Sequence, residues 1–173
     1  MAKKITRRGR KLARARKDIL LHWYKSVPSL EDQAFAARQR SSSYRKFEVG
    51  SAAIGVLPDG TFREYAGANR KERKGPRTFD DQCAEMEIID AARKTQCVEL
   101  AGMVTVAPHQ PDDFRDIDLG VTICCVYCRR RFVKELQDPR SPLKRHTRMI
   151  FVNADDRTKR VELTVEKVLL LCE

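Results

Sequence analysis

Apolar and polar residues follow two different periods along the chain, and together they predict a mixed α/β domain. Helical spacing predicts N-terminal helices at residues 10–26 and 30–40, with a break at Pro28 between them. Short apolar or alternating stretches predict strands, and Asp59-Gly60 is a turn that joins the first two strands into an antiparallel hairpin. The later segments continue in β-α-β-α order. The predicted strands are residues 49–57, 62–66, 100–107, 148–153 and 160–163, and the remaining predicted helices are residues 83–95, 126–137 and 165–171.

Length and composition limit the class of protein. The chain has 173 residues, of which 42% are hydrophobic and 7% aromatic, so one globular domain can bury a core without disulfides. No apolar run approaches the roughly 20 residues of a membrane span, and no secretory signal follows the basic start. We therefore expect a soluble cytoplasmic protein with no membrane partner. Its six cysteines should then be metal ligands or buried thiols.

Positive charge is concentrated at the N-terminus. The formal net charge is +11, and nine of the first 17 residues are Lys or Arg, whereas the rest of the chain carries 26 basic and 24 acidic residues. This contrast predicts a basic N-terminal extension, helical in part, at residues 1–28, and a folded domain at residues 29–173. The extension is either an arm that binds nucleic acid or a solubilising tail, and the sequence leaves both readings open.

Two cysteine-bearing segments, residues 83–85 (Cys-Ala-Glu) and 125–128 (Cys-Val-Tyr-Cys), each fall where a predicted helix begins. A thiol must lose its proton to bind zinc, and a helix N-terminus favours the thiolate. Three thiolates leave the fourth position of Zn²⁺ open for water, which is typical of a catalytic site. Cys83, Cys125 and Cys128 are therefore the predicted zinc ligands, and Glu85 is placed to move protons.

Other readings of the cysteines remain open at this stage. A lone C-x-x-C also occurs in structural zinc and redox sites, although these usually show a second matching pair. Cys124 could bind the metal together with Cys128 in place of Cys125. However, only two residues separate Cys125 from Cys128, and this spacing gives the tighter turn. Cys97 and Cys172 lie away from the cluster in sequence and are predicted to be buried thiols.

Five segments resemble, in the same order, those of the small zinc-dependent cytidine deaminases. They are residues 44–53 (YRKFEVGSAA), 67–69 (GAN), 83–85, 125–129 and 163–170, so that the resemblance covers roughly residues 29–173. It implies a three-layer α/β/α fold with a mixed five-stranded sheet, in a homotetramer or dimer. It also implies that a catalytic domain at residues 29–173 hydrolytically deaminates cytosine to uracil in cytidine or deoxycytidine. By the same resemblance Phe47 would pack against the base, Asn69 would hydrogen-bond the sugar, and the Ala84 backbone would meet the polar edge of the ring.

The segment at residues 70–77 departs from the family pattern. Lys71 stands where the family carries a Glu that grips the ribose, and the segment offers five positive charges. Lys71, Arg73, Lys74 and Arg77 are candidate anion-binding residues, unless the loop is simply solvated and pairs with the acidic stretch at residues 112–118. A deaminase of cytosine in tRNA or single-stranded DNA is therefore a second reading. A third is a catalytically silent, zinc-stabilised RNA-binding module, against which the presence of Glu85 argues.

Overall fold

The computed structural model describes residues 7–43, 47–71, 82–109 and 120–171. Its centre is a five-stranded sheet in the order β3-β2-β5-β6-β7. Strand β2 pairs antiparallel with β3 and β5, β5 pairs parallel with β6, and β6 pairs antiparallel with β7, so the predicted mixed sheet is confirmed. The strands are β2 (Gly50–Val56), β3 (Phe62–Ala68), β5 (Glu99–Ala107), β6 (Arg148–Asn153) and β7 (Arg160–Thr164).

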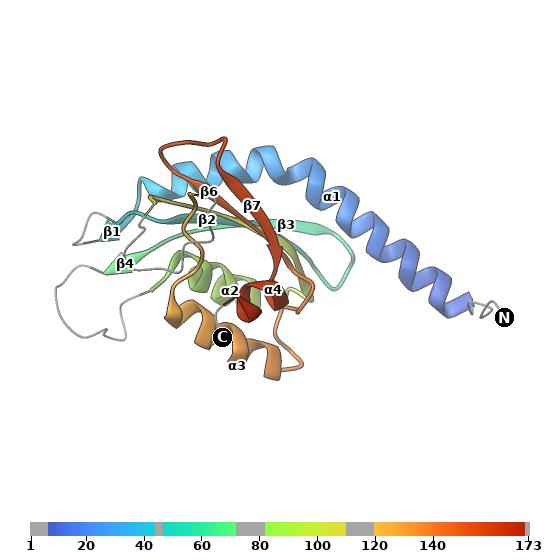
Figure 1. The fold of residues 1–173 in the computed structure, drawn as a ribbon. Helices are drawn as coiled ribbons and strands as arrows, with labels where there is room; N and C mark the ends of the chain where they lie inside the picture. The colour runs from blue at the N-terminus through green and yellow to red at the C-terminus, as the bar shows by residue number, and fades with distance from the viewer. Residues whose placement is uncertain (1–6, 44–46, 72–81, 110–119, 172–173) are drawn as a thin grey trace.

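Helices cover both faces of this sheet (Figure 1). Helix α1 (Arg7–Arg38) crosses one face, while α2 (Ala84–Lys94), α3 (Val126–Gln137) and α4 (Val165–Leu170) lie on the other. A separate hydrophobic cluster fills each interface, one between α1 and the sheet and one between the sheet and α2, α3 and α4. The predicted three-layer α/β/α fold is therefore confirmed. None of the described helices is long and apolar enough to cross a membrane.

The predicted helix break at Pro28 is wrong, because α1 runs without interruption through this residue. An interior proline costs about 3 kcal/mol, but Pro28 itself is exposed while Val27 and Leu30 are buried against the sheet. Burial of such a side chain contributes roughly 1.5–3 kcal/mol, so packing outweighs the missing hydrogen bond. The division into residues 1–28 and 29–173 remains a prediction, and its boundary falls inside α1.

Two strand glycines let α1 lie directly on the sheet. A Cβ atom on Gly50 of β2 would collide with the Ala34 carbonyl oxygen of α1. A Cβ atom on Gly102 of β5 would lie 2.7 Å from the ring of Trp23, which is completely buried. The Ala34 carbonyl and the Trp23 indole therefore occupy the space that side chains at these two positions would need. This close packing fixes the position of α1 on the sheet.

A second, very short sheet lies beside the start of β2. Strands β1 (Ser42–Ser43) and β4 (Arg70–Lys71) pair in parallel, and Arg70 also forms an antiparallel bridge with Gln82. The predicted strands include neither of these two segments. This pairing brings the segment after α1 next to the end of β3 and the start of α2, where the candidate site is built.

Candidate metal and active site

The two helix starts that carry cysteine have the same local structure. Cys83 is the N-cap of α2 and Cys125 is the N-cap of α3, both in extended backbone conformation. Their carbonyl oxygens accept the first helical hydrogen bonds, from Glu87 N and Arg129 N, each at 3.1 Å. Neither cysteine side chain caps its own helix, so each sulfur is directed to other partners. Cys128 follows in the first turn of α3 and is fully buried.

The three predicted thiols come together in space. The Sγ atoms of Cys83 and Cys125 lie 3.5 Å apart, and those of Cys125 and Cys128 lie 3.6 Å apart. Tetrahedral zinc with Zn–S bonds of about 2.3 Å requires sulfurs about 3.8 Å apart. The spacing therefore fits one zinc ion, and within the described part of the chain this is the cluster of His, Cys, Asp or Glu side chains that could hold a metal.

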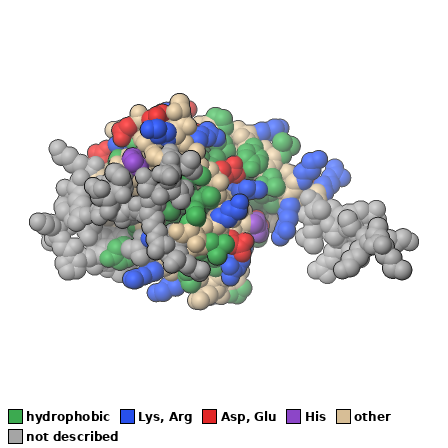
Figure 2. Space-filling model, viewed as in Figure 1, with side chains coloured by type: hydrophobic (Ala, Val, Ile, Leu, Met, Phe, Trp, Pro, Cys, Tyr) green, Lys and Arg blue, Asp and Glu red, His purple; other side chains and the backbone are tan. Residues whose placement is uncertain are grey.

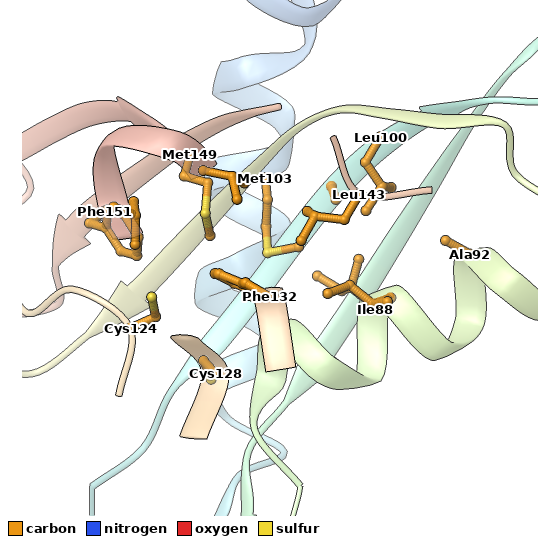
Figure 3. Packing of buried hydrophobic residues seen from close by; sticks show 14 of the residues in the cluster. Ile88, Ala92, Leu100, Met103, Cys124, Cys128, Phe132, Leu143, Met149 and Phe151 are labelled. Carbon is orange, nitrogen blue, oxygen red and sulfur yellow. The ribbon is translucent and has the colours of Figure 1, made fainter. Parts of the chain in front are cut away.

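The other cysteines take different positions. Cys124 is buried in the hydrophobic cluster beneath the sheet, and Figure 3 shows it beside Phe151 of β6. The thiol that lies with Cys83 and Cys128 is therefore that of Cys125, and not that of Cys124. Cys97 is buried and its Sγ donates a hydrogen bond to the Glu99 carbonyl at 3.4 Å, as expected for a buried thiol. Cys172 lies outside the described residues.

The thiol pKa values shift in the direction opposite to the one that the helix N-termini led us to expect. The hydrogen bond with Cys125 and burial raise the pKa of Cys83 to about 12. Hydrogen bonds with Cys125 and Cys83, together with burial, raise the pKa of Cys128 as well. Each thiolate would stand beside other sulfurs and the Glu85 carboxylate, so negative charge is disfavoured without a cation. Binding of a divalent metal must displace these protons.

Glu85 lies at the thiol cluster. It sits in the first turn of α2, is 3% exposed, and its Oε2 accepts a hydrogen bond from Cys128 Sγ at 3.5 Å. Ala84 is completely buried at the start of the same helix. The partly buried Phe47 packs with Ala84, Val49 and Ala107. Of the two predicted base-contacting residues, Ala84 therefore lies between Cys83 and Glu85 in the chain, and Phe47 packs against the cluster that contains Ala84.

Asn69 makes its described contacts within the chain. Its Oδ1 accepts hydrogen bonds from Ser41 Oγ at 2.6 Å and from Val49 N at 2.7 Å, and its Nδ2 donates to the Phe47 carbonyl at 2.8 Å. The side chain thus ties together three points of the segment before β2. A sugar contact by Asn69 remains a prediction.

The candidate anion-binding residues are not placed. Arg73, Lys74 and Arg77 lie outside the described residues, and of Lys71 only the backbone, in β4, is described. The neighbouring Arg70 donates to Gln82 Oε1 at 3.0 Å and to Glu87 Oε1 at 3.1 Å. Anion binding by this segment therefore remains a prediction.

Sequence reasoning missed a buried acid that connects the two cysteine-bearing helices. Glu135 of α3 accepts hydrogen bonds from Arg93 of α2 and from Ser141, both at 2.6 Å, and from Arg131 at 2.9 Å. Arg93 and Glu135 each follow an N-cap cysteine by ten positions, so the helices meet at both ends. The i,i+4 spacing of Arg131 and Glu135 was a visible signal, whereas the Arg93 contact depends on tertiary structure.

Glu87 was also missed. Its Oε2 accepts a hydrogen bond from Ala68 N at 2.9 Å, which fixes the end of β3 against α2. Gly67 permits this approach, because a Cβ atom there would lie 2.6 Å from the Ala84 carbonyl oxygen. Glu87 follows Cys83 by one helical turn, and this spacing could have indicated a role at the same end of the helix.

Comparison with solved structures shows which fold this is. Cytidine deaminase from Burkholderia pseudomallei superposes with a TM-score of 0.57 at 18% identity, over 81% of this chain and 93% of that one. This chain has the cytidine deaminase fold. Cytidine deaminases from Mycobacterium leprae and Mycobacterium tuberculosis superpose with TM-scores of 0.48 and 0.49, at 19% and 15% identity, over 82% of this chain and 95% and 92% of theirs. No family model and no curated protein matches the sequence.

The resemblance inferred from the sequence segments is therefore confirmed at the level of the fold. In this cytidine deaminase fold the helices α2 and α3 bring their N-termini together on one side of the sheet, and the three thiols and Glu85 lie there. The fold alone does not determine the chemistry. The case for a reaction rests on those four side chains.

Proposed function

We propose that the chain is a zinc-dependent hydrolytic deaminase that converts cytosine to uracil in cytidine or deoxycytidine. This proposal rests mainly on one observation: the thiols of Cys83, Cys125 and Cys128 lie close enough together to bind one zinc ion. The Glu85 carboxylate accepts a hydrogen bond from one of them, Cys128. Three thiolates complete three of four tetrahedral positions, as in catalytic zinc sites. The cytidine deaminase fold supports cytosine as the reacting base.

The reaction consumes one water and releases one ammonia per cytosine. Cys83, Cys125 and Cys128 would hold a zinc ion, which would supply a Lewis acid that lowers the pKa of water toward neutrality. The Glu85 carboxylate takes a proton from the water that attacks C4 and gives it to N3 of the ring. Glu85 then moves the second proton of that water from the new C4 hydroxyl to the amino group, and the C4–N bond breaks as ammonia leaves and the C4 carbonyl forms. Its burial keeps bulk water from competing for these protons.

The neighbouring residues would bind and orient the base. Phe47 packs against the cluster that contains Ala84, so a pyrimidine between Phe47 and the thiol cluster would lie next to Glu85. The backbone at Ala84 would meet the polar edge of the ring. Stacking of a base on an aromatic side chain contributes about 1–3 kcal/mol.

A panel of substrates tests this proposal. The zinc-loaded protein is incubated with cytidine, deoxycytidine, their phosphates, and cytosine-containing RNA and single-stranded DNA, and uracil is scored by mass. We expect product from a free nucleoside. Product from a polymer alone would favour the second candidate below, and product from none of these would overturn the assignment as a deaminase.

The second candidate is a deaminase of cytosine in RNA or single-stranded DNA, and the shape of α1 favours it. The helix has 32 residues, about 48 Å at 1.5 Å per residue, and its N-terminal part extends beyond the sheet (Figure 1). Arg14, Arg16 and Lys17 are exposed there, and Figure 2 shows basic side chains where α1 leaves the domain. Leu12 is the sole bulky apolar residue among residues 7–18, which suits a phosphate backbone better than a membrane surface.

Deletion of residues 2–17 tests the basic arm. If the arm binds nucleic acid, the affinity for RNA or single-stranded DNA should fall, and the dependence of that affinity on salt should become less steep. Cytidine turnover is the control, because the deletion leaves the thiol cluster untouched. Equal polymer binding by the truncated and intact proteins would identify the arm as a solubilising tail.

A cytoplasmic location and a homo-oligomeric state, tetramer or dimer, are also part of the proposal. Reducing conditions would keep the zinc-binding thiols available. Exposed hydrophobic side chains on the helical layer, Tyr127, Val133 and Leu170, support burial between subunits. Light scattering of the purified protein gives the oligomeric state, and a monomer would contradict this part.

A further inference from the structure

The first half of α1 carries positive charge that the rest of the fold does not neutralise. Asp18 is the sole acidic residue among residues 7–30, which contain eight Lys and Arg. Arg14, Arg16 and Lys17 are exposed, and no ion pair between described residues includes them. By contrast, the arginines that reach α1 from the β6–β7 turn and from β7 pair with acids of its second half at 3.1 and 3.4 Å. The charge of the first half is therefore available to a partner.

Helical geometry places part of this charge on the side of α1 that turns away from the sheet. Lys17 and Lys25 follow Arg14 by three and eleven positions, close to one and three turns of 3.6 residues, so the three share one side of the helix. Trp23 follows Arg14 by nine positions, half a turn out of phase, and is completely buried on the sheet. Arg14, Lys17 and Lys25 are exposed and form what we call the outer stripe.

The outer stripe is far from the thiol cluster. Helix α1 covers one face of the sheet, whereas α2 and α3 lie on the other (Figure 1). Gly67 of β3 lies against Ala84 of α2, which marks the end of the sheet nearest the thiols, and at the same end Gly50 of β2 lies against Ala34 of α1. Arg14 precedes Ala34 by 20 positions, about 30 Å along the helix at 1.5 Å per residue. The outer stripe therefore lies on the opposite layer and extends away from the thiols.

Packing on the sheet holds α1, and with it the outer stripe, in one direction. The buried Trp23 ring fills the space above Gly102 of β5. The ring of His22 stacks on Phe62 of β3, with their centroids 3.7 Å apart. From these anchors the helix continues without interruption toward its N-terminus. The basic half of α1 therefore cannot fold back around the sheet to the thiols of its own chain.

We propose that the outer stripe docks the phosphate backbone of a nucleic acid at a surface separate from the catalytic site, so that one chain binds nucleic acid and a nucleoside at the same time. A row of cations attracts phosphates without reading the base sequence. Leu21 lies between the cations on this side, and one leucine is too little apolar surface to enter a membrane. The inference rests on the proposed function for the position of the catalytic site.

Binding of a labelled strand of eight thymidine nucleotides, followed by fluorescence anisotropy at several salt concentrations, tests the docking. The zinc-loaded full chain is compared with a variant in which Arg14→Gln, Lys17→Gln and Lys25→Gln are combined. Each phosphate contact contributes about 0.7 to the slope of log affinity against log salt for a single strand. We expect the variant to bind more weakly and its slope to be less steep by about 2. Failure of the wild type to bind the strand at low salt would overturn the proposal.

A matched control separates the outer stripe from net charge. It neutralises three exposed lysines on the helices of the other layer, one each from α2, α3 and α4: Lys94→Gln, Lys134→Gln and Lys167→Gln. This variant has the same net charge as the first, and we expect it to bind the strand with the affinity and salt slope of the wild type. Equal losses in the two variants would show that net charge alone attracts the strand and would overturn docking at the outer stripe.

Competition shows whether the two sites are separate. Cytidine turnover is measured with and without a saturating concentration of the thymidine strand, which contains no cytosine. We expect kcat and KM for cytidine to stay unchanged, and saturating cytidine to leave the anisotropy of the bound strand unchanged. A KM for cytidine that rises with the concentration of the strand would place the strand in the catalytic site and overturn the proposal.

The outcomes distinguish this inference from the proposed function. Anisotropy needs no turnover, so if the wild type does not convert cytidine, the deaminase assignment fails while docking is still decided by the two variants. Separation of the sites is then read from alkylation of Cys125 in the metal-free protein, followed by mass spectrometry. The bound strand should leave the rate of this reaction unchanged, and protection of Cys125 by the strand would overturn the separation.

Discussion

Replacement of Glu135 by Gln tests how firmly the two cysteine-bearing helices are joined. The Glu135 side chain is 3% exposed and pairs with Arg93 at 2.6 Å and Arg131 at 2.9 Å. Loss of one partner from a buried ion pair costs about 3–5 kcal/mol. Arg93 is 33% exposed and also pairs with Asp138 at 3.0 Å, so water and Asp138 retain part of its stabilisation. We therefore expect Glu135→Gln to lower the free energy of unfolding by about 2–3 kcal/mol.

Urea unfolding at pH 7 measures this loss. The matched control is Glu166→Gln, because Glu166 is 55% exposed and lies 3.8 Å from Arg145. An exposed pair of this kind contributes at most about 0.5–1 kcal/mol. If Glu135→Gln is no more destabilised than Glu166→Gln, the buried network does not hold α2 against α3 and the reasoning is refuted.

The pH dependence gives a second test of the same network. Burial alone would raise the pKa of Glu135, but hydrogen bonds from Ser141, Arg93 and Arg131 outweigh it and lower the pKa. The folded-state pKa therefore lies below the unfolded value of about 4.3. The contribution of the Glu135 carboxylate to the free energy of unfolding is fully present above the unfolded-state pKa. It is lost as the pH falls through the folded-state pKa. The stability difference between wild type and Glu135→Gln should be constant near neutral pH and should narrow below about pH 4.

Three further predictions follow from the packing and the thiols. Gly102→Ala should lower the free energy of unfolding by about 1–3 kcal/mol, because the new Cβ would press on the Trp23 ring; unchanged urea unfolding would contradict the close contact. Pro28→Ala should raise the free energy of unfolding by about 1–2 kcal/mol, since it restores a helical N–H inside α1, and a loss would show that Pro28 shapes the helix. Zinc affinity, measured by competition with a chelator, should rise about tenfold per pH unit for each displaced thiol proton, because the pKa values of Cys83 and Cys128 are raised; an affinity independent of pH would contradict the protonated cluster.

Most helices and strands could be predicted from the sequence because burial on the sheet imposes a clear period. The helix at residues 126–137 and the strand at residues 148–153 match α3 and β6 end to end. Pro28 shows where local rules fail: the helix continues because its neighbours Val27 and Leu30 are buried on the sheet, and this packing is invisible in a local window.

The candidate site was predictable to the extent that its residues lie close together in sequence. The spacing of Cys125 and Cys128 indicates candidate metal ligands at a helix start, and the spacing of Cys83 and Glu85 indicates a thiol with a carboxylate beside it at another. The raised thiol pKa values could not be foreseen, because they arise when two helix ends meet. The contacts of Asn69 and the pairing of Arg93 with Glu135 also join residues 20 or more positions apart, and only the tertiary fold brings them together.

The most direct test of the central claim is one measurement on two proteins, wild type and Glu85→Ala, in which zinc content and the conversion of cytidine to uridine are determined on the same samples. In the proposed reaction Glu85 carries protons and the three thiols bind the metal, so both proteins should hold about one zinc per chain. Only the wild type should deaminate, since loss of a general acid/base typically costs about 10²- to 10⁴-fold. A wild type without zinc, or a Glu85→Ala variant with near-normal turnover, would contradict the account.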